Sequence, residues 1–334
     1  MLSFTGNGIY CKAGDFYIDP WRPVDRAVVT HAHSDHSRWG MKHYLAHSDS
    51  LPVMRLRLGE INAEGLGYGE VRSINGVKVS LHPAGHIIGS AQVRVEHKGE
   101  VWVVSGDYKT APDRTCAAFE PVKCHHFITE STFGLPVFFW KDEELVFAEI
   151  NAWWQKCKDE GKNAVIYAYS LGKAQRILSG VDASIGPIVC HGAVENTNDV
   201  LRMGGMQLPV TIRAQREHTK GTFKGALIVA PPSADGSAWL KRFAPYETAF
   251  ASGWMQVRGT RRRRNMDRGF VLSDHADWPG LLSAIEATEA ENIYVTHGYT
   301  DHFSAYLNEL GYNACTVKTE YGTDDDEPQT ANEE

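Results

Sequence analysis

The sequence predicts a mixed α/β protein, and three observations indicate this class. The motif HAHSDH, residues 31–36, follows the apolar run 27–30, and this pattern predicts a buried strand that ends in a ligand-rich loop. Further His and Asp residues stand at or just after the ends of other apolar runs. Between residues 141 and 265, strand and helix patterns alternate, which indicates a second α/β unit.

The His-rich motif offers four ligands within six residues, namely His31, His33, Asp35 and His36. Zinc takes about four nitrogen, sulfur or oxygen ligands, and a catalytic zinc site keeps one position open for water. So many ligands in one short loop therefore favour two adjacent ions over one. A His-rich surface loop is the alternative, and the buried strand directly before the motif argues against it.

Asp19 follows the apolar run 16–18 and precedes Pro20, just ahead of the His-rich motif. A carboxylate at this place could orient one of the ligands. An ordinary Asp-Pro turn explains the same residues, and the spacing alone favours the turn.

His86 lies in the stretch PAGHIIGSA, where Gly85 and Gly89 permit a sharply bent backbone. We expect it to be the third imidazole on the first ion. His82 is a competitor, but it ends a predicted strand before a proline and lacks the flanking glycines. An ordinary buried histidine is the alternative interpretation of His86.

Two carboxylates follow the next predicted strands. Asp107 comes after the apolar run 100–105 and suits a ligand shared by two cations about 3.5–4 Å apart, a separation that serves phosphoester hydrolysis. Glu130 comes directly after the run 127–129. Both acids are therefore expected at the end of a buried strand, as is the His-rich motif.

The middle of the chain begins with a strongly helical pattern over residues 141–161, followed by a strand over residues 163–169. Ser170 and Lys173 then open a helix whose N-terminal amides could hold a phosphate together with these side chains. Capping of the helix by Ser170 is an equal alternative. Further strands are expected over residues 226–230 and 249–254.

Arg258 and the run of four arginines that begins at Arg261 precede the last apolar segments. A solvated loop is the more common interpretation of such a run, and phosphate contact is the alternative. His275 then follows the apolar run 270–273, and His297 follows a strand over residues 293–295. His302, a rival of His297, is expected one helical turn farther along.

The composition fits a packed protein, with 43% hydrophobic residues, 13 Tyr, 13 Phe and 9 Trp. No apolar run approaches the ~20 residues of a membrane span, and the first residues lack the pattern of a secretion signal. The six scattered cysteines indicate reduced thiols. We therefore expect a cytoplasmic protein without a membrane partner.

The net charge of −7 hides an uneven distribution. Residues 320–334 carry seven acids and no base, whereas residues 202–268 carry 13 Lys/Arg against 4 Asp/Glu. A basic segment in an otherwise neutral body is compatible with a polyanionic substrate. The acidic tail from residue 323 is expected to be disordered.

The motifs HAHSDH, PAGHIIGSA, GDY, TESTFG, SDHADW and THG, in this order, resemble those of the metallo-β-lactamase fold and, within it, the β-CASP nucleases. That family includes Artemis-like DNA nucleases and the cleavage-and-polyadenylation endonuclease. The residues of these motifs are most similar to those of the bacterial ligase-associated DNA exonuclease group. The resemblance covers nearly the whole chain up to about residue 322.

The resemblance implies an αββα sandwich interrupted by a β-CASP α/β cap. Residues 1–140 and 266–322 would form the metallo-β-lactamase domain, residues 141–265 the insert, and residues 323–334 the tail. The implied metal ligands are His31, His33 and His86 for the first zinc, and Asp35, His36 and His297 for the second, with Asp107 shared.

The implied catalytic residues are Asp35, Asp19, Glu130 and His275. Asp19 matches the acidic first motif of the family, which raises its orienting role above the turn. Glu130 and His275 match the pair in which a carboxylate orients a His that faces the scissile phosphate. The candidate nucleic-acid contacts are Ser131, Ser170, Lys173, Arg258 and Arg261.

The activity that the resemblance implies is a DNA exonuclease in repair or end processing, which acts by a two-zinc hydroxide mechanism. Manganese is an alternative ion. The implied substrate is single-stranded DNA or DNA ends, and the implied functional partners are an ATP-dependent DNA ligase and a helicase.

Three rival functions follow from the same residues. His297 resembles the RNA-processing branch, because the DNA branch usually has an apolar residue there, so an RNA-processing ribonuclease is the first alternative. A glyoxalase II-like thioester hydrolase is the second, but it needs neither the insert nor the arginine run. A non-catalytic scaffold is the third, and it would be expected to have lost ligands.

Overall fold

The computed structural model describes residues 1–215, 217–259 and 266–321. The chain divides into two compact units. The first unit comprises Met1–Phe139 and His275–Glu334, and the second comprises Trp140–Asp274. The arginine run from Arg261 and the acidic tail lie outside the described residues, so the predictions made for them stay predictions.

The first unit opens with a six-stranded sheet, here sheet A, in the order β1-β2-β3-β4-β5-β6. β3, β4, β5 and β6 are parallel neighbours, so the carboxyl ends of these strands share one edge. The strands of sheet A are β1 Leu2–Thr5, β2 Gly8–Cys11, β3 Phe16–Ile18, β4 Arg26–Val28, β5 His43–His47 and β6 Ala63–Leu66; the short helices η1 Ser48–Ser50 and α1 Leu51–Leu58 follow β5.

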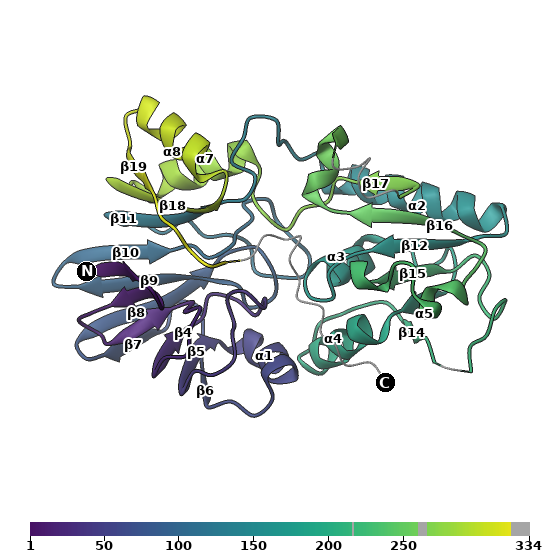
Figure 1. Cartoon of the computed structure of the whole chain (residues 1–334), viewed down its shortest axis with the longest axis horizontal. Helices are drawn as coiled ribbons and strands as arrows, with labels where there is room; N and C mark the ends of the chain where they lie inside the picture. The colour runs from purple at the N-terminus through teal and green to yellow at the C-terminus, as the bar shows by residue number, and fades with distance from the viewer. Residues whose placement is uncertain (216, 260–265, 322–334) are drawn as a thin grey trace. The chain divides into compact units, whose positions relative to one another are not determined.

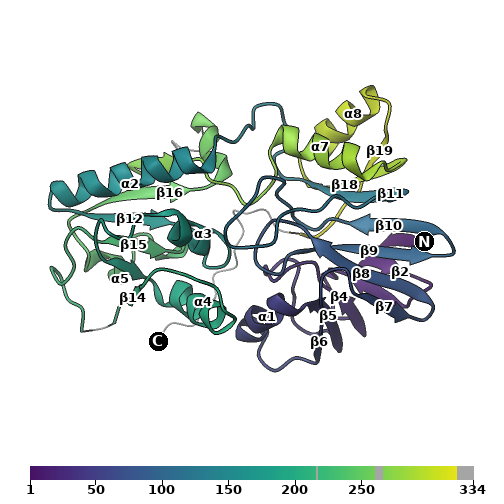
Figure 2. The ribbon, with the colours of Figure 1, turned by 180° about the vertical axis from the view of Figure 1, so that it is seen from behind.

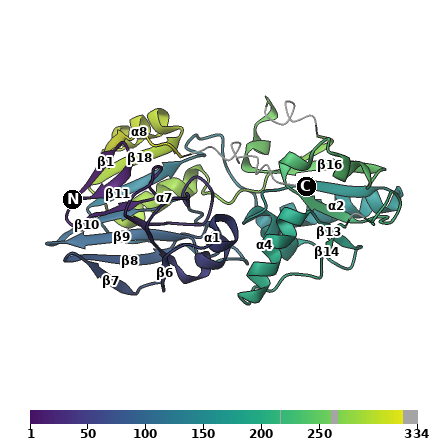
Figure 3. The same ribbon diagram turned by 60° about the horizontal axis from the view of Figure 1, so that its bottom comes forward.

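A second sheet of the first unit, here sheet B, has seven strands in the order β19-β18-β11-β10-β9-β8-β7. β10, β11, β18 and β19 are parallel neighbours, and the remaining strands pair antiparallel. Figure 3 shows β18, β11, β10, β9, β8 and β7 in this order. The strands are β7 Val71–Ile74, β8 Val77–Pro83, β9 Ala91–His97, β10 Glu100–Val104, β11 His126–Ser131, β18 Asn292–Gly298 and β19 Asn313–Thr316.

Alternating side chains let sheet B bury both of its faces. On one face, residues such as Val79, Val93 and Val104 pack against Ile9 and Ile18 of sheet A. On the other face, a second set packs against the helices α7 Trp278–Thr288 and α8 Thr300–Glu309 (Figure 1). The first unit is therefore a sandwich of two sheets with helices on the outer face of sheet B.

The second unit is built on a six-stranded sheet, here sheet C, whose pairs are all parallel. Both faces are buried, as is usual for parallel sheets, and α2 runs along β12 and β16 (Figure 2). The elements are α2 Glu143–Asp159, β12 Asn163–Tyr167, α3 Lys173–Gly180, β13 Ile188–Cys190, α4 Gly192–Met203, β14 Ile212–Arg213, β15 Leu227–Ala230, η2 Pro232–Ala234, α5 Ala238–Lys241, β16 Tyr246–Ala251, η3 Gly253–Gln256 and β17 Arg268–Phe270.

The mixed α/β class predicted from the sequence is confirmed, and most strands and helices lie where the patterns indicate. One difference is the run 249–254: β16 ends at Ala251, and Gly253–Gln256 forms a 3-10 helix instead of more strand. Ser252 begins this turn by accepting a hydrogen bond from the N–H of Trp254. Among the described residues, no helix is long and apolar enough to cross a membrane.

Candidate metal centre

The His-rich loop begins directly after β4 and turns back on itself. The backbone N–H of Ser37 donates to the carbonyl of His33 over 2.8 Å, which closes the turn. His31 and His36 are buried, with ring centroids 4.2 Å apart, whereas His33 and Asp35 are half-buried. The loop thus gathers four ligand candidates at the carboxyl end of β4.

Asp107 reaches this loop because a glycine precedes it. Gly106 has φ +58°, and a Cβ there would lie 2.6 Å from Oγ1 of Thr30, so only glycine allows this approach. The two carboxylate oxygens of Asp107 face different imidazoles. Oδ2 lies 3.4 Å from Nε2 of His31, 3.6 Å from that of His36 and 3.8 Å from that of His86, and Oδ1 lies 3.2 Å from Nε2 of His297.

His86 lies on the bent segment between β8 and β9. Gly85 before it has φ +75°, and a Cβ there would lie 2.2 Å from the carbonyl oxygen of Lys109. Nε2 of His86 lies 3.0 Å from Nδ1 of His33. Glycine at position 85 therefore lets this segment pack against Lys109, in a position from which His86 reaches His33 of the His-rich loop.

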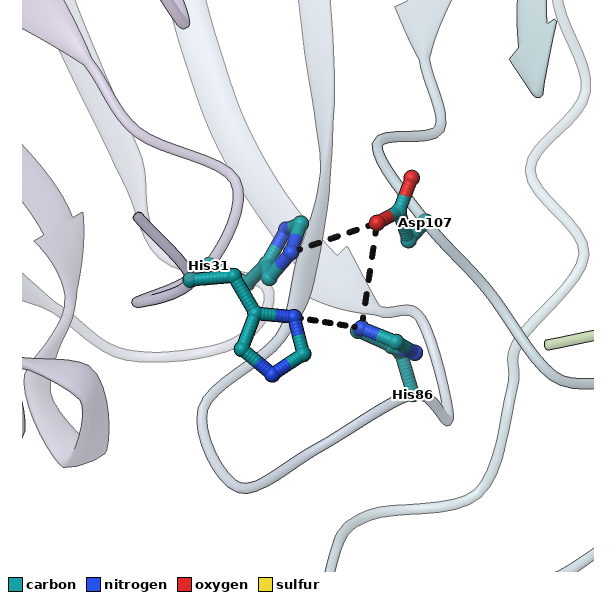
Figure 4. Close-up of side chains that lie close together, drawn as sticks. His31, His86 and Asp107 are labelled. Atoms are coloured by element: carbon teal, nitrogen blue, oxygen red, sulfur yellow. Dashed lines mark hydrogen bonds and ion pairs between the residues drawn. The ribbon is translucent and has the colours of Figure 1, made fainter. Parts of the chain in front are cut away.

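Figure 4 shows how His31, His86 and Asp107 converge from three separate segments. Together with His33, these residues offer one ligand atom each, and the four atoms lie within 4.8 Å of one another. Three imidazoles with a carboxylate at this spacing fit a single cation such as zinc.

His297 is placed by β18, which pairs parallel with β11. The hydroxyl of Ser131 at the end of β11 donates to the carbonyls of Thr296 and His297 over 3.0 and 2.7 Å. Ser131 is buried, and its hydroxyl joins the two strands. This position does not support the nucleic-acid contact predicted for Ser131, because the hydroxyl is engaged inside sheet B.

Asp19 lies beneath the His-rich loop and holds His36. Its carboxylate accepts hydrogen bonds from the N–H and the hydroxyl of Thr30, over 2.8 and 2.6 Å, and from Nδ1 of His36 over 2.8 Å. Asp19 has φ +42°, a conformation that is costly outside glycine. Because Nδ1 of His36 is held by Asp19, the other ring nitrogen, Nε2, faces Asp35 and lies 3.5 Å from its Oδ2. These contacts favour the ligand-orienting interpretation of Asp19 over a simple turn.

Glu130 and His275 lie beside the centre, and both are buried. Nδ1 of His275 lies 2.9 and 2.8 Å from the two carboxylate oxygens of Glu130. The ring of His275 lies 4.7 Å from the ring of His86, centroid to centroid. Asp107, Glu130 and His275 also form a second group of ligand atoms within 4.8 Å.

Burial and neighbouring charges move the pKa values of the cluster in opposite directions. Burial lowers the pKa of His31 well below its ordinary value, so this imidazole is neutral and able to bind a cation. Burial alone would also lower the pKa of His36, but Asp35, Asp107 and Asp19 raise it to about 10. Likewise, burial would raise the pKa of Asp107, but His36 and other imidazoles hold it well below its usual range.

Several buried polar atoms of the cluster have no hydrogen-bond partner among the described residues. They include Nε2 of His31, Nε2 of His36 and Oδ1 of Asp107. An unsatisfied buried polar atom costs about 1–3 kcal/mol, and here such atoms face one another across the same small space. A cation bound there would satisfy them, so the donor set fits a metal.

Lys173 lies in surroundings that differ from those predicted for it. It is 1% exposed, and its ammonium lies 3.2 Å from Oδ2 of Asp274 and donates to the carbonyl of Leu272 over 3.3 Å. Because its charge is neutralised inside the second unit, the structure does not support the predicted phosphate contact of Lys173.

The other predicted nucleic-acid contacts have separate outcomes. Ser170 is half-buried and does not cap α3, because the N-cap is Gly172, whose N–H donates to the side chain of Gln175 over 2.8 Å. Arg258 is exposed, as a phosphate contact requires. Arg261 lies outside the described residues.

Sequence reasoning missed several residues that support the centre. The backbone N–H of Tyr108 donates to Glu130 over 2.8 Å, and the Thr30 hydroxyl lies 3.0 Å from Nδ1 of His31. Tyr321 stacks on His36. The position of Thr30, between a predicted strand and the His-rich motif, could have indicated its role. Nothing near Tyr321 in the sequence indicates a site.

Several curated proteins are similar to the chain, and two of them are described here. A protein of Opitutus terrae named "Probable DNA ligase" is 30% identical over 315 residues, which are 93% of this chain and 30% of that protein. Cleavage and polyadenylation specificity factor 73 of Drosophila melanogaster is 30% identical over 182 residues, which are 52% of this chain and 26% of that protein. The chain thus spans less than a third of the length of these relatives.

A crystal structure of a protein of unknown function from Enterococcus faecalis V583 has a TM-score of 0.57 with this chain. The likeness covers 89% of this chain and 80% of that chain, at 11% sequence identity, and therefore concerns the fold alone. No family model matches the sequence.

Proposed function

Because the chain belongs to the metallo-β-lactamase-fold β-CASP nucleases, we propose that it is a DNA nuclease that hydrolyses phosphodiester bonds at a two-metal site. The observation that carries the proposal is the position of Asp107. One of its oxygens faces the imidazoles of His31, His36 and His86, and the other faces His297. A buried carboxylate with imidazoles on both oxygens suits a ligand shared by two cations.

The proposed ligands form two sets that share Asp107, and His36 is assigned to the second set although it lies nearest the same oxygen of Asp107 as His31 and His86. The set for the first ion is His31, His33 and His86, and the set for the second ion is Asp35, His36 and His297. Imidazole nitrogens with carboxylate oxygens favour zinc, and manganese is the alternative because it also accepts such ligands. A pair of such ions, when bound, supplies Lewis acidity and lowers the pKa of a water ligand toward neutrality.

The residues around the ligands would hold and move protons. Asp19 keeps the proton of His36 on Nδ1, so that Nε2 is presented as the ligand atom. Glu130 accepts a hydrogen bond from Nδ1–H of His275 in the same way. His275 would then donate the proton on Nε2 to the leaving oxygen of the substrate, and general-acid help of this kind contributes about 10²–10⁴-fold.

DNA is the proposed substrate class, and two features support it. The Opitutus terrae relative is named "Probable DNA ligase", and nearly the whole of this chain is similar to part of that protein. A functional association with an ATP-dependent DNA ligase is proposed on the same ground. The excess of Lys and Arg over residues 202–268 suits a polyanion.

RNA is the second candidate substrate because of a specific relative and a specific residue. The relative is the Drosophila melanogaster protein, whose name places it in polyadenylation. The residue is His297, which resembles the RNA-processing branch. We also propose that the second unit, Trp140–Asp274, is the β-CASP insert.

End-labelled DNA and RNA of the same sequence test the proposal directly. The protein is stripped with a chelator, reloaded with Zn²⁺ or Mn²⁺, and incubated with single-stranded and double-stranded forms of each. We expect metal-dependent DNA cleavage that His31→Ala abolishes and that the exposed control variant His302→Ala retains. Faster RNA cleavage would assign the RNA alternative, and reloaded protein that is inert toward both polymers would refute a nuclease.

A further inference from the structure

Tyr321, a few residues after β19, lies against the candidate metal centre. Its ring stacks on His36 with centroids 4.3 Å apart and an interplanar angle of 14°. The ring of His36 also contacts His31, at 4.2 Å and 39°. Two aromatic neighbours at these distances leave the plane of His36 little freedom to tilt.

The segment that carries Tyr321 is tied to the residues around the His-rich loop. The Tyr321 hydroxyl donates to the carbonyl of Asp19 over 3.3 Å. The carboxylate of Glu320 pairs with Arg22 over 2.6 Å, and the carbonyl of Glu320 accepts a hydrogen bond from Arg38. The position of the ring is therefore fixed by several contacts and not by the stack alone.

Tyr321 and Asp19 restrict different motions of the same imidazole. The hydrogen bond from Nδ1 of His36 to Asp19 fixes the direction of the ring within its plane. The stack on Tyr321 fixes the plane itself. Both the hydrogen bond and the stack are needed to fix the direction of Nε2 of His36. An imidazole ring that keeps only its Nδ1 hydrogen bond can still tilt about the axis of that hydrogen bond.

The same side chain also borders His297. Among the described residues, the ring contacts of Tyr321 are with Trp21, His36 and His297. The contact with His297 is edge-on, with centroids 5.8 Å apart and planes at 79°. Tyr321 further lines a small cavity together with Asp19, His36 and His297, so loss of its ring would admit water beside the Asp19–His36 hydrogen bond.

We propose that Tyr321 is a positioning residue for the second ion. It contacts both imidazoles assigned to that ion, His36 and His297, and neither His33 nor His86 of the first set. The inference rests on the ligand roles given under the proposed function. Contacts that orient metal ligands are worth about 10–100-fold in metal affinity, and we expect an effect of this size on the second ion only.

Zinc titration by calorimetry of the chelator-stripped protein, residues 1–334, tests this role. We expect Tyr321→Ala to bind the first Zn²⁺ as the natural protein does and the second about 10–100-fold more weakly. Tyr321→Phe keeps the flat ring and should restore the second affinity to within a few-fold. Tyr10→Ala removes a tyrosine whose hydroxyl donates to the exposed residue Asp15, its one hydrogen-bond partner in the part of the chain that the structure describes. This variant is the matched control and should bind both ions normally.

A second variant guards against a folding defect. Tyr321→Leu fills the space without a flat ring, and it decides the question if circular dichroism shows that Tyr321→Ala is unfolded. Unchanged binding of both ions by a folded Ala or Leu variant would overturn the role of Tyr321 and leave the proposed nuclease intact. Another combination is loss of the second ion in these variants together with a natural protein that cleaves neither DNA nor RNA. That combination would refute the proposed nuclease activity and support the positioning role of Tyr321. A natural protein that binds fewer than two ions would overturn both.

Discussion

Nδ1 of His275 lies 2.8 Å from a carboxylate oxygen of Glu130, although 145 residues separate the two along the chain. Glu130 is itself fixed, because one of its oxygens accepts the backbone N–H of Tyr108 over 2.8 Å. Asp19 and His36 repeat the relationship within the His-rich loop region, again at 2.8 Å. Each of these imidazoles is thus oriented by a buried carboxylate, an arrangement that determines which nitrogen faces the centre.

Replacing His275 separates its proposed role in proton donation from metal binding. We expect His275→Ala to keep its metal content and to lose about 10²–10⁴-fold in turnover, because general-acid help is lost. Metal analysis and single-turnover cleavage of end-labelled DNA measure the two quantities. His302→Ala removes an exposed imidazole on α8 and should leave both unchanged. Cleavage by His275→Ala within a few-fold of the natural rate would show that the acid role is wrong.

Replacing Asp107 tests the shared ligand. We expect Asp107→Asn to lose the second ion, because an amide offers one neutral oxygen where the carboxylate offers two anionic ones. Zinc stoichiometry after dialysis is the measurement, and Asp301→Asn, at an exposed position of α8, is the control. Two ions per chain in the Asp107→Asn protein would contradict a bridging carboxylate.

Two glycines with similar backbone angles isolate the effect of crowding near His86. Gly76 has φ +82° with no atom within 4 Å of an added Cβ, whereas Gly85 has φ +75° and would place its Cβ 2.2 Å from the carbonyl of Lys109. We expect Gly76→Ala to cost about 1–2 kcal/mol of stability, the ordinary cost of the left-handed conformation.

Gly85→Ala should cost more than Gly76→Ala and should also weaken Zn²⁺ binding, because His86 must move with the displaced segment. Urea unfolding and calorimetric titration of the two variants give the comparison. Equal stabilities and equal zinc affinities would show that the segment before His86 yields without moving the ligand.

The sequence indicated the gathering of the cluster because strand ends are readable from apolar runs. Parallel strands of one sheet end at the same edge, so polar residues after β10, β11 and β18 had to lie near one another. That reasoning places Asp107, Glu130 and His297 along one edge of sheet B, and the structure has them there. Asp107 lies beyond the end of β10, whereas Glu130 and His297 are near the last residues of β11 and β18 themselves.

The same reasoning failed where tertiary contacts decide the environment of a side chain. Lys173 stands at the start of a helix, as a phosphate ligand would, but a buried carboxylate at Asp274 neutralises it. Tyr321 meets Asp19 across 302 residues of sequence, and neither neighbouring sequence carries a periodic signal that could pair them. Long-range contacts of single side chains are not encoded in local patterns.

Glu195 in α4 provides a test of stability that is independent of the metal centre. Its buried carboxylate accepts hydrogen bonds from Arg202 over 2.9 Å, from Thr211 over 2.7 Å and from Asn198 over 3.1 Å. Burial alone would raise the pKa of Glu195, but these donors lower it below the ordinary value of 4.5. The unfolded chain therefore binds a proton at Glu195 more readily than the native chain does.

It follows that the ionised carboxylate stabilises the native state fully above pH 4.5 and that this stabilisation is lost as the pH falls through the lower native pKa. We expect Glu195→Gln to lose about 1.5–3 kcal/mol at pH 7, the range for hydrogen bonds to charged groups. The deficit relative to the natural protein should shrink steadily in urea unfolding below pH 4.5. Glu286→Gln, at an exposed position of α7, should show little deficit at either pH. A stability deficit of Glu195→Gln that stays constant between pH 7 and pH 3.5 would contradict this expectation. This result would show that the network stabilises the second unit by packing and not by the charge of Glu195.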